Sequence, residues 1–322
     1  MPTDFAQTLN AFGRAREPFF FAINFEQTDF IVHALDALPD IILYALEATT
    51  NASLLFTCKN SPKLFPKQWS DKKRYKKAFE EIIEAICSGN TYLLNLTFPT
   101  SVALEGSLEE IFYASDAPFK CCVKDKFVCF SPERFVKIED NTISTYPMKG
   151  TIDARLSDAK AMILNDEKEM AEHVMVVDLL RNDLSMVAKN VCVEKFRYVE
   201  TIKAGEKELL QVSSKITGKM DVSWHECIGD ILQTLLPAGS ISGTPKRSSV
   251  EIIRAVEGYE RGYFTGVFGV YDGNVLDSGV MIRFIEQTPQ GFIFKSGGGI
   301  TLLSEMEKEY DELCAKVYLP VH

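Results

Sequence analysis

The sequence has few histidines and no excess of basic residues, and each shortage excludes a class of function. Its four histidines are not spaced as metal ligands, which argues against a zinc site. The chain has 35 lysines and arginines against 45 aspartates and glutamates, a formal net charge of −10, so no basic surface for nucleic acid is expected. An acidic protein that binds an anionic metabolite needs local positive groups or a metal ion.

Cysteine pairs with CxxC spacing and long apolar runs are also missing. The eight cysteines of this 322-residue chain are expected to be free thiols in a reducing compartment. No run approaches the roughly 20 apolar residues of a membrane-spanning helix, and the first residues do not resemble a secretion signal. We therefore expect a cytoplasmic protein with no membrane or nucleic-acid partner. Glycine-rich dinucleotide loops and Walker phosphate loops are absent as well.

The elements that are present indicate an α+β fold, because strands joined by hairpins alternate with grouped helices rather than forming βαβ units. Apolar spacing predicts a helix from Tyr75 to Ile86 that ends at Gly89. A helix over 166–184 is expected to bury a face of Met170, Val174, Val177 and Leu180. Further helices are expected after Thr244 as N-cap, and after a Ser304/Glu307 capping box; strands are expected over 92–98, 120–130, 134–144, 263–271, 275–285 and 291–295.

The most informative feature is a lysine accompanied by two pairs of glutamates. Lys149 lies in a turn-prone segment, and Glu169 with Glu172, like Glu309 with Glu312, are three residues apart. Helical spacing places each pair on one face, with Cβ atoms about 5–6 Å apart. Two such pairs would suit Mg²⁺, which oxygen ligands hold while waters remain for an anionic substrate. Each pair alone is more typical of a solvated helix face.

Other segments suit an anion. Gly297-Gly298-Gly299 follows a predicted strand, where open backbone N–H groups can receive a carboxylate, although a tight turn would have the same sequence. The segment 237–246, rich in small and hydroxyl residues, leads into a helix N-terminus. Arg283 lies in an apolar strand, where it either forms a structural pair or binds a carboxylate. Glu133, in a loop between strands, is a candidate general acid or a solvated glutamate.

Taken together, these segments resemble the chorismate-utilising enzymes over roughly residues 72 to 318. That family includes anthranilate synthase component I, aminodeoxychorismate synthase component I, isochorismate synthase and salicylate synthase. The agreement covers many ordered motifs, so chance is a poor explanation. The matching segments are Ser131–Phe135, Pro147–Thr151, Lys168–His173, Val177–Leu184, Gly239–Lys246, Arg261–Gly266, Ile282-Arg283 and Gly297–Ile300, with the acidic C-terminal helix.

The resemblance implies an α+β fold in which a large sandwich of mainly antiparallel β-sheets is flanked by helices. It implies one domain overall, with residues 1–70 as a short N-terminal region integrated with the sheet and 71–322 as the chorismate-binding catalytic region. Lysine at position 149 resembles the aminodeoxychorismate synthases, whereas the anthranilate and isochorismate enzymes resemble each other in having alanine there. Aminodeoxychorismate synthase would aminate C4 of chorismate and yield 4-amino-4-deoxychorismate, a precursor of p-aminobenzoate and folate.

The resemblance also implies residue roles. Lys149 would attack C2 of chorismate as a neutral amine and form a covalent adduct, and Glu133 would protonate the departing C4 hydroxyl. Mg²⁺ would be the cofactor and would face the ring carboxylate. The implied metal ligands are Glu169, Glu172, Glu309 and Glu312; the implied substrate-binding residues are Thr151 and Ser240 beside the ring, and Tyr263, Arg283, Gly298 and Gly299 at the enolpyruvyl carboxylate.

The implied partners follow from what the sequence does not contain. A glutaminase nucleophile signature is missing, so ammonia is expected from a separate glutamine amidotransferase subunit, and a separate aminodeoxychorismate lyase would act on the product. Gln211 stands where anthranilate synthases have histidine, and Leu93 stands where the amination enzymes usually have glutamine and isochorismate synthases have a lysine base. Both departures weigh against the alternatives, anthranilate or isochorismate formation. A third alternative is a non-catalytic protein that only binds an amidotransferase.

Overall fold

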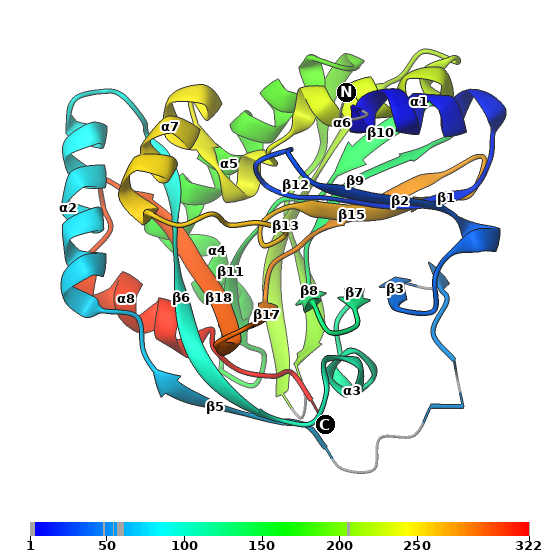
Figure 1. Ribbon diagram of the computed structural model, residues 1–322. Helices are drawn as coiled ribbons and strands as arrows, with labels where there is room; N and C mark the ends of the chain where they lie inside the picture. Colours follow the sequence, from blue (N-terminus) through cyan, green and yellow to red (C-terminus); the bar gives the residue numbers. More distant parts are fainter. Residues whose placement is uncertain (1–3, 48, 54, 57–60, 205–206, 322) are drawn as a thin grey trace. The chain divides into compact units, whose positions relative to one another are not determined.

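The computed structural model describes residues 4–321 apart from 48, 54, 57–60 and 205–206 (Figure 1). The chain folds into two compact units, each assembled from three segments that alternate along the sequence. The first unit contains the described residues of Met1–Pro39, Glu133–Ser240 and Gly266–Val280, and the second contains those of Asp40–Pro132, Ile241–Thr265 and Met281–His322.

The first unit is built on a nine-stranded antiparallel sheet, in which eight strands follow the order β11-β13-β10-β9-β16-β15-β1-β2 and β12 also pairs with β13. All five residues of β1 are buried. Gly269 in β15 makes room for them, because a Cβ there would lie 2.7 Å from the Phe21 ring. The strands are β1 (Phe19–Ile23), β2 (Phe30–Ala34), β9 (Arg134–Glu139), β10 (Thr142–Thr145), β11 (Met148–Asp153), β12 (Lys189–Ala204), β13 (Lys207–Lys219), β15 (Val267–Tyr271) and β16 (Leu276–Val280).

Two groups of helices pack in the first unit. Helices α4 (Ala159–Asn165) and α5 (Glu167–Ser185) lie against β11 and β13, and α5 also touches β12. Helices α1 (Phe5–Ala15) and α6 (Ile228–Leu235) lie against each other, as Figure 1 shows, and Gly229 allows their close approach because a Cβ there would meet the Ala6 backbone at 2.1 Å. The short helices are η1 (Leu35–Ala37), η2 (Trp224–Cys227) and η3 (Gly239–Ile241).

The second unit is built on its own nine-stranded antiparallel sheet, with the order β14-β6-β18-β17-β8-β7-β3-β4 and with β5 paired to β6. Helices α2 (Lys72–Cys87) and α8 (Met306–Ala315) lie against β18, α7 (Lys246–Glu257) lies against β6, and α3 (Leu108–Ala114) covers β7 and β8. The strands are β3 (Ile42–Leu46), β4 (Thr49–Thr50), β5 (Lys63–Gln68), β6 (Leu93–Glu105), β7 (Phe119–Val123), β8 (Phe127–Ser131), β14 (Gly243–Thr244), β17 (Phe284–Thr288) and β18 (Gly291–Thr301).

The α+β fold predicted from the sequence is confirmed, and so are the helices expected near 75–86 and 166–184. The buried face expected for the second of these helices is wrong in its first half. Met170 and Val174 are 39% and 46% exposed, while Glu172 and His173 of α5 are buried. The helix therefore turns polar groups toward the sheet where periodicity alone predicted apolar ones.

Both predicted side-chain caps are also wrong. No side chain caps α8, whose N-cap is Glu305, because the Ser304 hydroxyl accepts a hydrogen bond from Thr301 N at 3.2 Å instead. Helix α7 begins after Pro245 as N-cap, again without a side-chain cap. The strand expected over 275–285 is two strands, β16 and β17, which belong to different sheets.

Two further expectations concern thiols and membranes. The seven cysteines within the described residues are free, and Cys58 lies outside those residues. None of the described helices has the length and apolar character needed to cross a membrane.

The second unit contains a buried ion pair between Arg261 and Glu257, whose side chains are each 1% exposed. Arg261 donates to Glu257 from Nε at 2.8 Å and from Nη2 at 2.6 Å. Glu257 also accepts hydrogen bonds from the backbone and hydroxyl of Thr97, at 2.8 and 2.9 Å. These contacts join the end of α7 to β6, so the pair fixes the helix beside the strand.

We expect Glu257→Gln to lower the free energy of unfolding by about 3 kcal/mol, because it leaves the Arg261 charge buried without its counter-charge. The matched control is Glu251→Gln on the same helix, which removes the exposed pair with Arg247 and should change stability by less than about 0.5 kcal/mol. Urea unfolding of both variants measures this difference. Equal losses in the two variants would contradict the structural role of the buried pair.

Candidate functional site

In the first unit, the candidate site begins at an irregularity in β11. Gly150 has φ +77°, and the register with β13 shifts there, so that Lys149 pairs with Val212 whereas Thr151 pairs with Gln211. A bulge of this kind re-aims the side chains beside it. Lys149 reaches α5, and its Nζ lies 3.4 Å from Oε2 of Glu172.

Both predicted glutamates of α5 approach this strand. Glu172 is buried, and a Cβ added to Gly150 would lie 3.4 Å from Oε2 of Glu169. Asp166 sets the start of the helix by accepting a hydrogen bond from Glu169 N at 2.9 Å. The first unit thus brings together Lys149 and two carboxylates, while Thr151 is exposed on the same strand.

His173, the residue after Glu172, is a member of this site that sequence reasoning did not single out. Its ring is 1% exposed, and Nε2 lies 2.6 Å from the Ser214 hydroxyl, which also accepts a hydrogen bond from Arg197 N at 2.9 Å. Burial, together with the charges of Arg197 and Lys149, lowers the pKa of His173 to about 4. The ring is therefore neutral at pH 7 and fixes α5 to β13. The signal available in the sequence was that His173 directly follows the predicted pair Glu169 and Glu172.

Glu133 and Ser240 also meet in the first unit. The Ser240 hydroxyl donates a hydrogen bond to Oε1 of Glu133. Burial raises the pKa of the Glu133 carboxyl above its usual value, and the Ser240 hydrogen bond and the Lys149 charge oppose that rise. A small cavity beside this pair, about 10 Å³, is also lined by Tyr146 and Leu180. The arrangement suits a carboxylic acid that keeps its proton for transfer.

In the second unit, the candidate residues gather where β17 leaves β18. The pairing of these strands ends at Phe284 opposite Lys295, whereas β18 continues to Thr301 with β6 on its other side. Arg283 precedes β17 with a left-handed backbone, φ +51°. Within the described residues, the edge of β18 that carries Gly297–Gly299 is therefore not paired with β17, and the three glycines lie within the strand rather than in the alternative tight turn.

The acidic pair of α8 lies beside these glycines. A Cβ added to Gly298 would be 3.7 Å from Glu309 Oε2 and 3.9 Å from Glu312 Oε1. Glu309 is buried, and Glu312 forms an ion pair with Lys316 at 2.7 Å. Lys316 also donates to the Gly297 carbonyl at 2.8 Å. The second unit therefore brings Gly298, Glu309 and Glu312 together, with Gly299 next along the strand.

Tyr263 and Arg283 are linked through aromatic rings. Phe127 stacks on Tyr263 and on Phe284, with ring centroids 5.0 Å apart in both cases. Phe284 directly follows Arg283, whose guanidinium carbon lies 5.5 Å from the ring centroid of Tyr318. A phenol and a guanidinium are the kinds of hydrogen-bond donor that can bind a carboxylate.

Carboxylate oxygens are the donors that Mg²⁺ prefers. Among the described residues, no three His, Cys, Asp or Glu side chains are grouped so that they could hold a metal ion by themselves. Each unit instead offers a pair, Glu169 with Glu172 and Glu309 with Glu312. A pair fits Mg²⁺, which commonly takes one or two carboxylates and completes its coordination with water and substrate.

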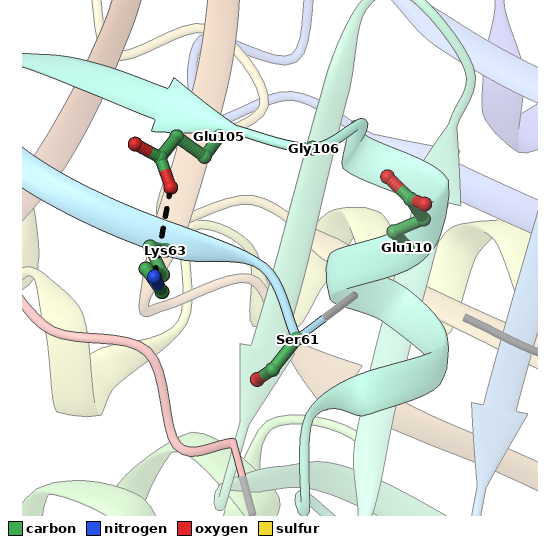
Figure 2. A pocket seen from close by; sticks show the side chains of 5 residues that line it. All are labelled: Ser61, Lys63, Glu105, Gly106 and Glu110. Carbon is green, nitrogen blue, oxygen red and sulfur yellow. Dashed lines mark ion pairs between the residues drawn. The ribbon is translucent and has the colours of Figure 1, made fainter. Parts of the chain in front are cut away.

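The second unit also has a hollow of about 450 Å³ lined by Ser61, Lys63, Glu105, Gly106 and Glu110 (Figure 2). Lys63 and Glu105 face each other across β5 and β6, with Nζ and Oε2 3.9 Å apart. Glu110 accepts a hydrogen bond from Ser107 N at 2.8 Å in the capping box of α3. These roles are structural, and none of the predicted site residues lines the hollow.

Comparison with protein families identifies the kind of protein that carries these residues. The family model described as chorismate binding enzyme matches residues 24–321. The chain belongs to the chorismate-binding enzyme family. This membership confirms the resemblance seen in the sequence.

Relatives within this family are similar over different lengths. A Haemophilus influenzae protein named as an uncharacterised PabA-like protein is 47% identical over 317 residues, which are 98% of this chain and 96% of that one. Aminodeoxychorismate synthase component 1 from Salmonella typhimurium is 32% identical over 264 residues, or 77% of this chain and 57% of the relative. A solved structure from Bacillus anthracis shares the fold, with a TM-score of 0.70 and 20% identity, and the match covers 97% of this chain and 86% of that one. Its description is a 2,3-dihydroxybenzoate-specific isochorismate synthase.

Two neighbouring glycines in β18 of this chorismate-binding enzyme differ in the space that a side chain would have. A Cβ on Gly297 would lie 2.5 Å from the Leu96 carbonyl oxygen, whereas a Cβ on Gly298 meets only side-chain ends at 3.7 Å or more. We expect Gly297→Ala to lower the free energy of unfolding by about 3 kcal/mol and Gly298→Ala to change it by less than about 1 kcal/mol. Urea unfolding measures both, and the reverse order of stability would show that the strand edge is built differently.

Proposed function

We propose that this chorismate-binding enzyme aminates chorismate at C4 in the presence of Mg²⁺, giving 4-amino-4-deoxychorismate for p-aminobenzoate and folate synthesis. Ammonia would come from a glutamine amidotransferase subunit, and a separate lyase would act on the product. The observation that carries the proposal is Lys149, whose amine lies 3.4 Å from Glu172 beside the bulge of β11. The similarity to aminodeoxychorismate synthase component 1 supports it.

The chemistry is assigned to the first unit. Lys149 attacks C2, both conjugated ring double bonds shift toward C4, and the C4–O bond breaks as the hydroxyl leaves as water. Glu133 donates the proton that this water needs, for which its raised pKa is suited. Ammonia then adds at C4, both double bonds shift back, and the lysine amine leaves C2. Atoms balance, since chorismate and ammonia become 4-amino-4-deoxychorismate and water.

Binding is assigned residue by residue. Glu169 and Glu172 in the first unit, and Glu309 and Glu312 in the second, are the proposed carboxylates for Mg²⁺. When bound, the metal supplies positive charge for the ring carboxylate of the substrate. Thr151 and Ser240 are proposed to border the ring. Tyr263, Arg283 and the backbone of Gly298 and Gly299 are proposed to hold the enolpyruvyl carboxylate, at the open edge of β18.

Two departures support amination over the alternative reactions. Leu93 is 2% exposed in β6 and has no group that could activate water, which an isochorismate synthase requires. Gln211 lies opposite Thr151 in the register of β11 and β13, where an anthranilate synthase would have histidine. Leucine cannot accept a proton as the base of an isochorismate synthase would, and glutamine cannot accept one as the histidine of an anthranilate synthase would.

Mass spectrometry of products from chorismate, ammonium and Mg²⁺ tests the proposal. We expect 4-amino-4-deoxychorismate, converted to p-aminobenzoate only when a lyase is added. Lys149→Ala should abolish any covalent chorismate adduct and slow amination by at least about a hundredfold, the usual scale for a positioned catalytic group. Lys149→Arg is the matched control that keeps the charge without a nucleophilic amine.

Several outcomes would contradict this proposal. Anthranilate or isochorismate as the product would assign the chain to another reaction of the family. Unchanged rate and product in Lys149→Ala would remove the nucleophile. No turnover by the wild type, with or without an amidotransferase, would favour a non-catalytic binding role.

The pH profile of kcat/KM tests the general acid. Glu133 must be protonated to act, so activity is present below its pKa and is lost as pH rises through it. Because the Ser240 hydrogen bond stabilises the ionised carboxylate, Ser240→Ala should raise this pKa further and move the alkaline limb to higher pH. Ser240→Thr, which keeps a hydroxyl, should leave the limb in place. A limb that stays fixed or moves to lower pH in the alanine variant would exclude Glu133 as the acid.

A further inference from the structure

Arg283 is held by an unusual combination of backbone and ring contacts. Its φ of +51° lies in the left-handed region, which is uncommon for a residue with a side chain. Its carbonyl accepts a hydrogen bond from Phe130 N at 3.2 Å, which fixes the turn into β17. Residues kept in such a conformation often serve a local function, and here the conformation takes the chain away from β18.

The guanidinium of Arg283 lies over the ring of Tyr318, with Cζ 5.5 Å from the ring centroid. Within the described residues, this guanidinium donates no hydrogen bond and forms no ion pair. A cation–π contact uses the charge of the guanidinium and none of its N–H groups, which can therefore form two parallel hydrogen bonds to a carboxylate. The stacking therefore restrains the group without consuming its donors.

Tyr318 belongs to a segment that is anchored on both sides. Val317 before it is buried in the core around α3. After it, Asp116 N donates to the Pro320 carbonyl at 2.9 Å, and Ser115 forms a β-bridge with Val321. Tyr318 itself is 40% exposed, so its ring adds little to the core. An anchored backbone that presents a half-exposed ring to an arginine is suited to positioning that arginine.

We propose that Tyr318 is a positioning residue that orients Arg283 for the substrate carboxylate. This inference rests on the proposed function, in which Arg283 binds the enolpyruvyl carboxylate of chorismate. Tyr318 acts through the ring face and needs no contact with the substrate. Its effect belongs to binding rather than to the chemical step, which is assigned to the first unit.

The test compares Tyr318→Phe, which keeps the ring, with Tyr318→Leu, which keeps apolar bulk and loses the π face. Steady-state kinetics with chorismate, ammonium and Mg²⁺ should give a KM for chorismate that rises roughly two- to fivefold in Tyr318→Leu, the range of an exposed cation–π contact. The kcat should change less than twofold, and Tyr318→Phe should match the wild type. Thermal unfolding confirms that each variant is folded.

A double-mutant cycle establishes whether Tyr318 acts through Arg283. In the Arg283→Gln background, Tyr318→Leu should cause no further rise in KM, because the group that it orients is missing. An additive rise, an unchanged KM in Tyr318→Leu alone, or a loss in Tyr318→Phe equal to that in Tyr318→Leu would overturn the inference. These results would leave the proposed function intact. The proposed function fails instead if the wild-type protein does not consume chorismate, or if Arg283→Gln leaves the KM for chorismate unchanged.

Discussion

A lysine amine 3.4 Å from a buried glutamate is the interaction on which the first unit's site depends. It exists because two elements depart from regular patterns. Strand β11 shifts register at Gly150, and α5 turns Glu172 and His173 inward where an amphipathic helix would bury apolar side chains. Burying a charge is costly unless it is paired, and Lys149 supplies that pair. The same contact keeps a potential nucleophile beside a potential metal ligand.

The candidate site of the second unit also depends on an irregular element, the strand β17, whose pairing with β18 stops before β18 ends. β17 stops pairing at Phe284, so β18 keeps an edge on which Gly297–Gly299 and Arg283 are available. Backbone N–H groups at such an edge would be a liability if they stayed unpaired and buried, and a bound carboxylate satisfies them. Glu309 beside Gly298 brings negative charge to the same place, where a cation would relieve its repulsion of an anionic ligand. In the proposed function, this edge receives the enolpyruvyl carboxylate and the acidic pair contributes to binding Mg²⁺.

The sequence predicted what depends on local chemistry. The helix at 75–86 follows from apolar periodicity, and α2 includes it. The prediction failed over 275–285, where distant strands divide the segment between two sheets, and at Ser304, whose hydroxyl accepts a hydrogen bond from the nearby Thr301 N instead of capping α8. The site residues came from family resemblance, because a carboxylate buried against a strand, as in Glu172, looks from spacing alone like a solvated helix face. Tyr318 carried no signal, since its partner is distant in the sequence.

The relatives bear names of different reactions, although the fold is shared at 20% identity with a TM-score of 0.70. A common fold therefore cannot select the product, and the choice falls to a few side chains. On the proposed function, two of these side chains are Leu93 of β6, which cannot activate water, and Lys149 of β11, which would act as the nucleophile. A protein with a net charge of −10 needs local positive charge to bind a dianion, and in the proposed function Arg283, which lies against Tyr318, supplies that charge in the second unit.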